Sequence, residues 1–342
     1  MARSLNSLRR PVLAAAAVAA MAGGAALALP GQSTATTGSN PTQPTTICLT
    51  GSTSTATEVT VTLPQVAADP VLAYTPSYAG PCASYGAPSS LGNGTLRTFA
   101  QLDSAQKPLA IGIVFPKPTL QNLPTTMTDQ HHCYDVDGNG QIDEHTECMG
   151  GHEFPLPLPG ALTSAPGVPY KWALVNFNLM GHGPEGIYDV QHFDFHFYIQ
   201  PKAERDQIRA GSCGLVMNCD DFATATKPVP AQYMPPDYIS NGTAEVAMGN
   251  HLVDQTSPEW HNVLFTKTFI YGAYDSKISF LEPMITKAYF DGLSSGSNTN
   301  GCFPIKQPQS FEVAGWYPQD YCIRYRANRD DYTVSMENFK HS

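Results

Sequence analysis

The chain has 342 residues and a formal net charge of −10 at pH 7, from 19 basic and 29 acidic side chains. A surface of this sign repels nucleic acids and anionic membranes, so we expect neither as a partner. Only 14% of the residues are charged, and 28 glycines and 29 prolines interrupt the chain. This composition disfavours long amphipathic helices and favours short strands between turns.

The first 30 residues have the pattern of a secretory signal peptide. Three arginines precede an apolar run from residue 11 to residue 29, and two cleavage sites with small residues end at Ala28 and Ala35. The alternative for this segment is a retained membrane anchor. We predict export to the periplasm, the cell envelope or the surroundings of a bacterial cell, with no membrane attachment after cleavage.

A linker and a β-rich domain are predicted to follow. Residues 31–47 are mostly Thr, Ser, Gly, Pro and Gln, a composition that buries no core and is typical of a disordered linker. Residues 48–342 remain for the folded part, which is enough for one large domain or two smaller ones. Because prolines cluster between 226 and 237, two β halves joined near 220–245 are the alternative to one undivided domain.

Strands and one short helix are predicted along this domain. Apolar stretches bounded by turn residues predict strands at 58–63, 171–178 and 192–199, and hairpins at 96–115 and 265–284. The hairpin turns are predicted at 103–106 and near 275–277. One helix is predicted at 201–210, with a proline near its start and Gly211 at its end. The pattern predicts a mainly β fold, either a sandwich or a jelly-roll, cupin-like barrel.

All eight cysteines lie beyond the predicted signal peptide. They are Cys48, Cys82, Cys133, Cys148, Cys213, Cys219, Cys302 and Cys322. An even number of cysteines in an exported chain predicts four disulfides. The pairs 48–82, 133–148, 213–219 and 302–322 are the most economical because their members are close in sequence. Zinc binding is the alternative, but the chain has no Cys-x2-Cys pair.

The segment from residue 133 to residue 148 has the ligand spacing of a calcium loop inserted between two cysteines. Oxygen-bearing side chains occupy alternate positions, and a glycine follows where such a loop turns sharply. The predicted ligands are Asp135, Asp137, Asn139, Gln141 through its backbone carbonyl, and Asp143. This spacing predicts Ca²⁺ binding, with the Cys133–Cys148 disulfide closing the loop.

This loop resembles the calcium loop of EF-hands but departs from it in two ways. The twelfth position, where an EF-hand has a bidentate glutamate, is Thr146. No helix pattern precedes or follows the loop. We expect the missing carboxylate to come from Glu147 by a local shift, or from a neighbouring strand. The alternative is a solvated turn that binds no ion.

A second set of polar residues lies on the predicted strand at 192–199. Because side chains alternate on a strand, His192, Asp194 and His196 share one face, and the phenylalanines between them share the other face and belong to the core. Two histidines four positions apart on a flat strand are separated by ~13 Å, too far to ligate one metal ion. A bend, or pairing of each histidine with Asp194, is therefore required.

Three residues elsewhere in the sequence are candidates to complete this set. His182 and His251 sit in similar Met-Gly contexts, and Glu282 lies on a later predicted strand. Together the six residues predict a site for zinc, iron or manganese. The alternative is a buried network in which His, Asp and Tyr side chains hydrogen-bond to one another.

Several segments of the chain resemble the TTHB-type family of uncharacterised exported bacterial proteins. They are residues 93–99, 110–113, 151–159, 181–198, 248–251, 270–272 and 282–284, and the resemblance covers roughly residues 90 to 290. It implies a secreted, β-rich fold and homo-oligomer formation. It supplies no activity and no catalytic residue.

Two hypotheses about function follow from these patterns. In the leading one, the chain is a secreted calcium-binding protein whose calcium is structural and whose ligand or partner is unknown. In the competing one, it is a secreted, metal-dependent, cupin-like enzyme that uses the histidine cluster. The sequence assigns no catalytic residue in either case.

Overall fold

The computed structural model describes residues 40–51 and 57–342. The predicted signal peptide and most of the predicted linker lie outside the described residues. The chain from Asn40 to Ser342 groups into one folded unit. Within the described part, no helix is both long enough and apolar enough to span a bilayer.

A small sheet begins inside the predicted linker. Strand β1 (Pro44–Leu49) pairs with β2 (Val59–Pro64) and β3 (Tyr78–Ala79), and helix α1 (Gln65–Tyr74) follows β2 directly. The predicted linker end at residue 47 is therefore wrong. The run Thr-Thr-Ile favours extended backbone, and β1 pairs with β2 over all six of its residues.

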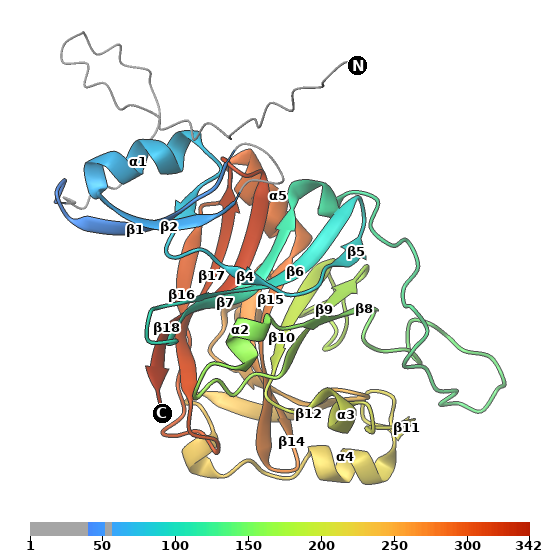
Figure 1. The fold of residues 1–342 in the computed structure, drawn as a ribbon. Helices are drawn as coiled ribbons and strands as arrows, with labels where there is room; N and C mark the ends of the chain where they lie inside the picture. Colours follow the sequence, from blue (N-terminus) through green and yellow to red (C-terminus); the bar gives the residue numbers. More distant parts are fainter. Residues whose placement is uncertain (1–39, 52–56) are drawn as a thin grey trace, which may run out of the picture. The chain divides into compact units, whose positions relative to one another are not determined.

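Two larger antiparallel sheets form most of the structure (Figure 1). The first sheet has the order β12 (Tyr238–Glu245), β13 (Gly249–Asp254), β14 (Lys267–Tyr274), β15 (Lys277–Thr286), β10 (His192–Tyr198), β9 (Trp172–Asn178) and β8 (His152–Pro157). The second sheet has the order β16 (Gly301–Pro304), β17 (Trp316–Arg326), β18 (Asp331–His341), β7 (Pro108–Pro116), β6 (Gly94–Leu102) and β4 (Ser84–Tyr85), and β5 (Ser89–Leu91) also pairs with β6. The protein is therefore mainly β, as predicted.

The predicted hairpin turns occur where turn chemistry places them. Between β14 and β15, Asp275 and Ser276 both have positive φ, at 50° and 63°, as a two-residue turn matched to strand twist requires. Between β6 and β7, the Asp103 carboxylate accepts hydrogen bonds from the backbone N–H groups of Ala105 at 2.8 Å and Lys107 at 2.9 Å. Local sequence therefore sets both connections.

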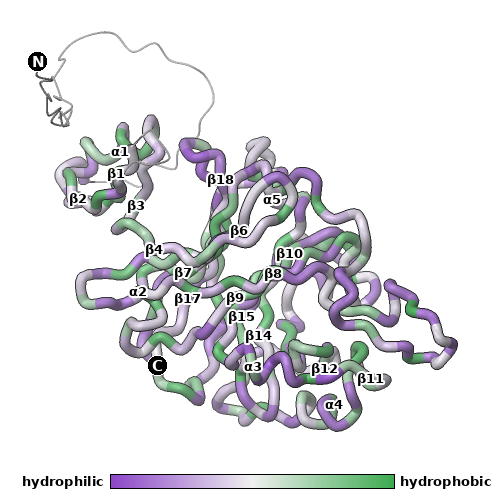
Figure 2. The backbone as a smooth tube through the Cα atoms, turned by 45° about the vertical axis from the view of Figure 1, so that its right-hand side comes forward, coloured by the Kyte–Doolittle hydropathy of each residue, from purple (hydrophilic) through white to green (hydrophobic). Residues whose placement is uncertain are grey.

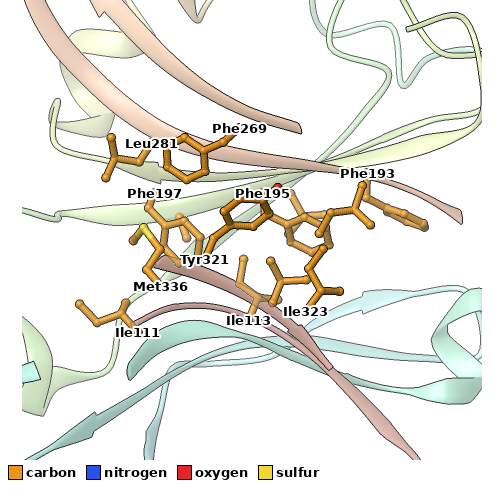
Figure 3. Packing of buried hydrophobic residues seen from close by; sticks show 14 of the residues in the cluster. Ile111, Ile113, Phe193, Phe195, Phe197, Phe269, Leu281, Tyr321, Ile323 and Met336 are labelled. Atoms are coloured by element: carbon orange, nitrogen blue, oxygen red, sulfur yellow. The ribbon is translucent and has the colours of Figure 1, made fainter. Parts of the chain in front are cut away.

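The core lies between the two large sheets. Phe193, Phe195 and Phe197 of β10 belong to the same buried cluster as Ile113 of β7 (Figure 3). Phe115 of β7 also belongs to this cluster. The rings of Phe115 and Phe195 are 6.2 Å apart and nearly parallel. Burying each such side chain contributes about 1.5–3 kcal/mol. The prediction that the phenylalanine face of this strand belongs to the core is confirmed.

Hydropathy along the chain follows this arrangement. Figure 2 shows hydrophobic residues gathered along strands such as β15, which is buried over nine of its ten residues. Burial on both faces of β15 includes its polar residues Ser279, Glu282 and Thr286.

Five α-helices occur among the described residues, where the sequence predicts one. They are α1, α2 (Gly160–Thr163), α3 (Lys202–Arg205), α4 (Cys219–Ala225) and α5 (Lys287–Ser295), and short 3₁₀ helices lie at Lys117–Leu120, Ala231–Tyr233 and Pro258–His261. The predicted helix at 201–210 stops at Arg205, because Ala210 already belongs to strand β11 (Ala210–Cys213). Helix α5 begins without a break after β15, where the Thr286 hydroxyl caps it by accepting from the Tyr289 N–H.

Neither large sheet closes on itself. The first ends at β12 and β8, and the second at β16 and β4, so the predicted cupin-like barrel is wrong. Residues 220–245 do not separate two β halves either, because β15, which follows them, pairs directly with β10, which precedes them. Apolar patterns predict where strands lie in the sequence but not which strands pair. Closure of a sheet and division into two β halves both depend on strand pairing.

All four disulfides join the cysteine pairs predicted from proximity in sequence. They are Cys48–Cys82, Cys133–Cys148, Cys213–Cys219 and Cys302–Cys322. Four disulfides in one chain are typical of a protein that folds in an oxidising environment outside the cytoplasm.

Candidate metal centres

The polar face of β10 is as deeply buried as its phenylalanine face. His192, Asp194 and His196 are exposed by 0%, 3% and 0%. The segment after β9 folds back over this face, so that the rings of His182 and His192 lie 4.7 Å apart. Buried polar side chains require partners, and the partners of these residues divide them into two groups.

The first group, which we call the open centre, consists of His182, His192 and Asp194. The His192 Nε2 atom lies 3.1 Å from Asp194 Oδ1, and the His182 Nε2 atom lies 3.5 Å from Asp194 Oδ2. One ligand atom from each residue falls within 4.8 Å of the other two. Ligands bound to one ion at about 2.0–2.1 Å in a tetrahedral arrangement are ~3.3 Å apart. The observed spacings match that value.

Backbone carbonyls orient both imidazoles of the open centre. The His182 Nδ1–H donates to the Gly183 carbonyl at 2.8 Å, and the His192 Nδ1–H donates to the Val190 carbonyl at 2.6 Å. In neutral imidazoles this leaves Nε2 of both rings unprotonated, and both Nε2 atoms face the same carboxylate. The Asn178 amide also lies 3.4 Å from His192 Nε2. Metal-binding histidines are oriented by their other nitrogen in this way.

An amide holds the carboxylate between these rings. The Asn178 Nδ2–H donates to Asp194 Oδ2 at 2.6 Å. The other oxygen, Oδ1, is buried and accepts no hydrogen bond from any group in the described part of the chain, although His192 Nε2 lies close to it. Asp194 Oδ1 is therefore available as a metal ligand.

The metal-free open centre balances the charge of Asp194 with a proton. Burial lowers the pKa of His182, but the hydrogen bond and the charge of Asp194 outweigh burial and raise it to about 9. Burial raises the pKa of Asp194, but the two histidines outweigh burial and hold it well below its usual range. A divalent cation would take over the role of that proton.

The open centre borders a cavity of about 390 Å³. His182, Asn178, Glu185, Met149 and Leu215 contribute to its lining. The His182 side chain is 23% exposed, whereas His192 is fully buried. One side of the centre is therefore accessible to a small molecule.

The second group, which we call the closed cluster, consists of His196, His251 and Glu282. The His196 Nε2 atom lies 3.4 Å from Glu282 Oε1, and the His251 Nε2 atom lies 3.8 Å from Glu282 Oε2. Burial is the main reason that the pKa falls to about 3 for His196 and about 4 for His251. Burial, and then the charges of Asp194 and Glu245, raise the pKa of Glu282.

The structure therefore brings all six predicted residues together on one face, but in two groups of three rather than in one site. The cause is the strand spacing noted above: His192 and His196 are too far apart on β10 to share an ion. The single histidine site of a cupin-like enzyme is corrected accordingly.

Sequence patterns missed two side chains near the open centre. Asn178 ends β9, where the register places it opposite His192, so correct strand pairing would have identified it. Glu245 is buried, which raises its pKa, and His182 only partly opposes the rise to about 7. The sequence around Glu245, Thr-Ala-Glu-Val, is that of an ordinary strand and contains no motif that indicates a functional site.

The predicted calcium loop brings three carboxylates together. Oxygens of Asp135, Asp137 and Glu147 lie within 4.8 Å of one another. Glu147 is only 5% exposed, and its carboxylate accepts hydrogen bonds from the backbone N–H groups of Val136 at 2.7 Å and Asp143 at 3.0 Å. The Glu147 carboxylate therefore lies beside Asp135 and Asp137.

The remaining predicted ligands of the loop make local contacts. The Asn139 Oδ1 atom accepts from the Gln141 N–H at 2.8 Å, and Asp143 Oδ1 accepts from the His145 N–H at 3.0 Å. Gly140 has φ of 82°, the left-handed conformation predicted for this position. Asp143 lies outside the group of three carboxylates.

Comparisons of the chain with family models, with curated proteins and with solved structures give no match. The similarity to the TTHB-type family stays a prediction. The fold and the residues of the sites define a mainly β, disulfide-linked protein with groups of side chains suited to metal binding.

Proposed function

We propose that this chain is an exported metalloprotein that binds a divalent transition metal at the open centre and calcium in the 133–148 loop. One observation carries the proposal for the open centre. Two imidazoles from different segments have Nδ1 fixed on backbone carbonyls and Nε2 directed at Asp194.

The donor set narrows the choice of metal. Two imidazole nitrogens and one carboxylate oxygen suit zinc, iron(II) or manganese, and they disfavour copper(I), which prefers sulfur ligands. Three protein ligands leave at least one coordination position for water or a substrate.

The adjoining cavity supports a second candidate function, that of a secreted metal-dependent enzyme. A bound metal would supply Lewis acidity at the cavity wall. His182 links the two, because it belongs to the open centre and also lines the cavity. Asn178 would hold Asp194 in place, and the backbone carbonyls would hold the two imidazoles.

Metal content tests the open centre. We expect Asp194→Asn to lower the affinity for Zn²⁺ at this centre at least 100-fold, because Asp194 is the anionic ligand of the centre and lies between its two histidines. The measurement is zinc titration of metal-free protein against a chromophoric chelator. Glu185→Gln, which removes a carboxylate from the cavity wall, should leave affinity unchanged. Equal zinc binding by wild type and Asp194→Asn would refute this assignment.

The calcium proposal rests on Glu147, which brings a third carboxylate to the loop. Residues 144, 145 and 148 at the end of this loop also line the cavity. Calcium bound by Asp135, Asp137 and Glu147 would therefore order one wall of the cavity, which is a structural role. The Cys133–Cys148 disulfide, with a separation of 15 residues, constrains the loop ends in place of the helices of an EF-hand.

Calcium is expected to raise the melting temperature of the wild type. With a Kd on the order of 10⁻⁴ M, about 10 mM CaCl₂ stabilises the folded chain by about 2.7 kcal/mol, or roughly 5 °C. Asp135→Ala should abolish the rise, and Asp69→Ala, an exposed change in α1, should preserve it. A full calcium response in Asp135→Ala would place the calcium elsewhere.

A further inference from the structure

We infer that the closed cluster is a second metal centre, in which His196, His251 and Glu282 hold a zinc-type divalent ion for structural purposes. The inference is independent of the proposed function at the open centre, because the two centres share no ligand. It rests on four observations: buried polar atoms without partners, the spacing of the ligand atoms, the orientation of His251 and the packing above the cluster.

The first observation is that the three side chains are buried without adequate hydrogen bonds. His196, His251 and Glu282 are exposed by 0%, 8% and 1%. Neither ring nitrogen of His196 has a hydrogen-bond partner anywhere in the described residues, and the same is true of Glu282 Oε2. Each such buried, unpaired group costs about 1–3 kcal/mol. One cation would satisfy His196 Nε2 and the carboxylate together.

The second observation is that the ligand atoms approach one another without hydrogen-bonding geometry. His196 Nε2 is 3.4 Å from Glu282 Oε1, yet this nitrogen makes no hydrogen bond within the described chain. Lone pairs that point at a common ion, rather than at each other, give this relation. The spacing is again close to the ~3.3 Å expected between ligands of a tetrahedral ion.

The third observation is that His251 is oriented as a ligand. Its Nδ1–H donates to the Thr243 carbonyl at 3.2 Å, and its Nε2 faces Glu282 at 3.8 Å. This is the orientation that both histidines of the open centre have, and it is the one that fixes a ligating imidazole.

The fourth observation is the aromatic cover of the cluster. The Phe280 ring meets His196 edge to face at 4.8 Å and His251 at 5.4 Å between centroids. Gly272 of the intervening strand β14 pairs with both His251 and Phe280, and a Cβ atom at this position would lie 2.2 Å from that ring. Gly272 therefore provides the space for the cover, and only the His251 side chain, at 10% exposed, reaches the solvent.

The two centres are neighbours but not a bridged pair. Asp194 and His196 lie two positions apart on one strand face, which separates them by ~6.6 Å. Bridged two-metal sites hold their ions ~3.5–4 Å apart. We therefore expect two mononuclear ions, one exchangeable beside the cavity and one enclosed.

Cobalt titration tests this inference. Metal-free wild type should bind two equivalents of Co²⁺ with the visible absorption of tetrahedral cobalt, and EDTA should remove one of them much more slowly. Glu282→Gln should abolish the slow equivalent only, and His192→Asn the fast one only. Glu259→Gln, a buried glutamate outside the cluster, is the matched control.

The outcomes separate the two proposals. Loss of no equivalent in Glu282→Gln, or a single equivalent in the wild type that His192→Asn abolishes, would overturn the second centre. A single equivalent that Glu282→Gln abolishes would overturn the open centre and support the closed one. If Glu282→Gln does not fold, His251→Gln on β13 replaces it.

Discussion

Replacing Glu153 with glutamine is expected to lower the free energy of unfolding by about 3 kcal/mol at pH 7. Glu153 on β8 contacts Arg205 of α3 and lies 3.1 Å from His132 Nε2. Arg205 is only 3% exposed, so the substitution removes the buried anion of this guanidinium and leaves only the half-exposed Asp206 carboxylate, 3.4 Å away. Removing one partner of a buried ion pair typically costs about 3–5 kcal/mol.

The size of this effect depends on pH in a direction that can be stated in advance. Burial raises the pKa of Glu153, but His132 and Arg205 outweigh burial and lower it from 4.5 to about 2. A depressed carboxyl pKa stabilises the fold fully above about pH 4.5, and this contribution is lost as the pH falls toward 2. The shift corresponds to roughly 3 kcal/mol. Wild type and Glu153→Gln should therefore converge in stability in this acid range.

Urea unfolding at neutral and acid pH measures both statements. Glu204→Gln is the matched control, because this exposed glutamate lies next to Arg205 on α3 and loses the same charge. It should change stability by less than about 0.5 kcal/mol. A difference between wild type and Glu153→Gln that stays constant from pH 7 to pH 2 would show that the ion pair is not its source.

Phe195→Ala is expected to be the most destabilising single change in the core, at about 3–5 kcal/mol. Phe195 is fully buried, and its ring packs against Phe115 of the second sheet and, at 6.0 Å, against Phe290 of α5. The substitution leaves a cavity where two sheets and a helix meet. Because domains are stable by only about 5–15 kcal/mol, a large part of the total is lost.

Leu109→Ala provides the comparison for this effect. Leu109 lies on β7, in the same layer as Phe115, but is 40% exposed. Its truncation should cost less than about 1 kcal/mol. Similar midpoints of thermal unfolding for Phe195→Ala and Leu109→Ala would contradict the position of the core.

Local patterns in the sequence predicted several features correctly. The alternation in His-Phe-Asp-Phe-His-Phe-Tyr separated the core face of β10 from its polar face, because strand geometry fixes a period of two. Asp275 and Ser276 predicted a tight turn because of the residue types that such a turn accepts. Cysteines close in sequence paired with each other in all four disulfides.

The incorrect predictions share one cause. Contacts with neighbouring segments in the fold override the structure that the sequence of a segment favours by itself. Residues at the end of the predicted linker became β1 because β2 supplied hydrogen-bond partners. The helix predicted at 201–210 ended early because its last residue entered β11. The barrel was wrong because apolar periodicity does not show whether the last strand of a sheet returns to pair with the first.

The sequence by itself determined which residues have metal-binding chemistry and which of them share a strand face, since side-chain type and strand period are local properties. Only the tertiary structure decided how they are grouped. The fold-back after β9 carried His182 to Asp194. Strand β15 pairs with β10 and brought Glu282 to His196. Strand β13, which β14 separates from β15, brought His251 to Glu282. The physical reason is that the ligands of one metal ion lie within a few ångströms of one another. Spacing along one strand does not determine which side chains come that close.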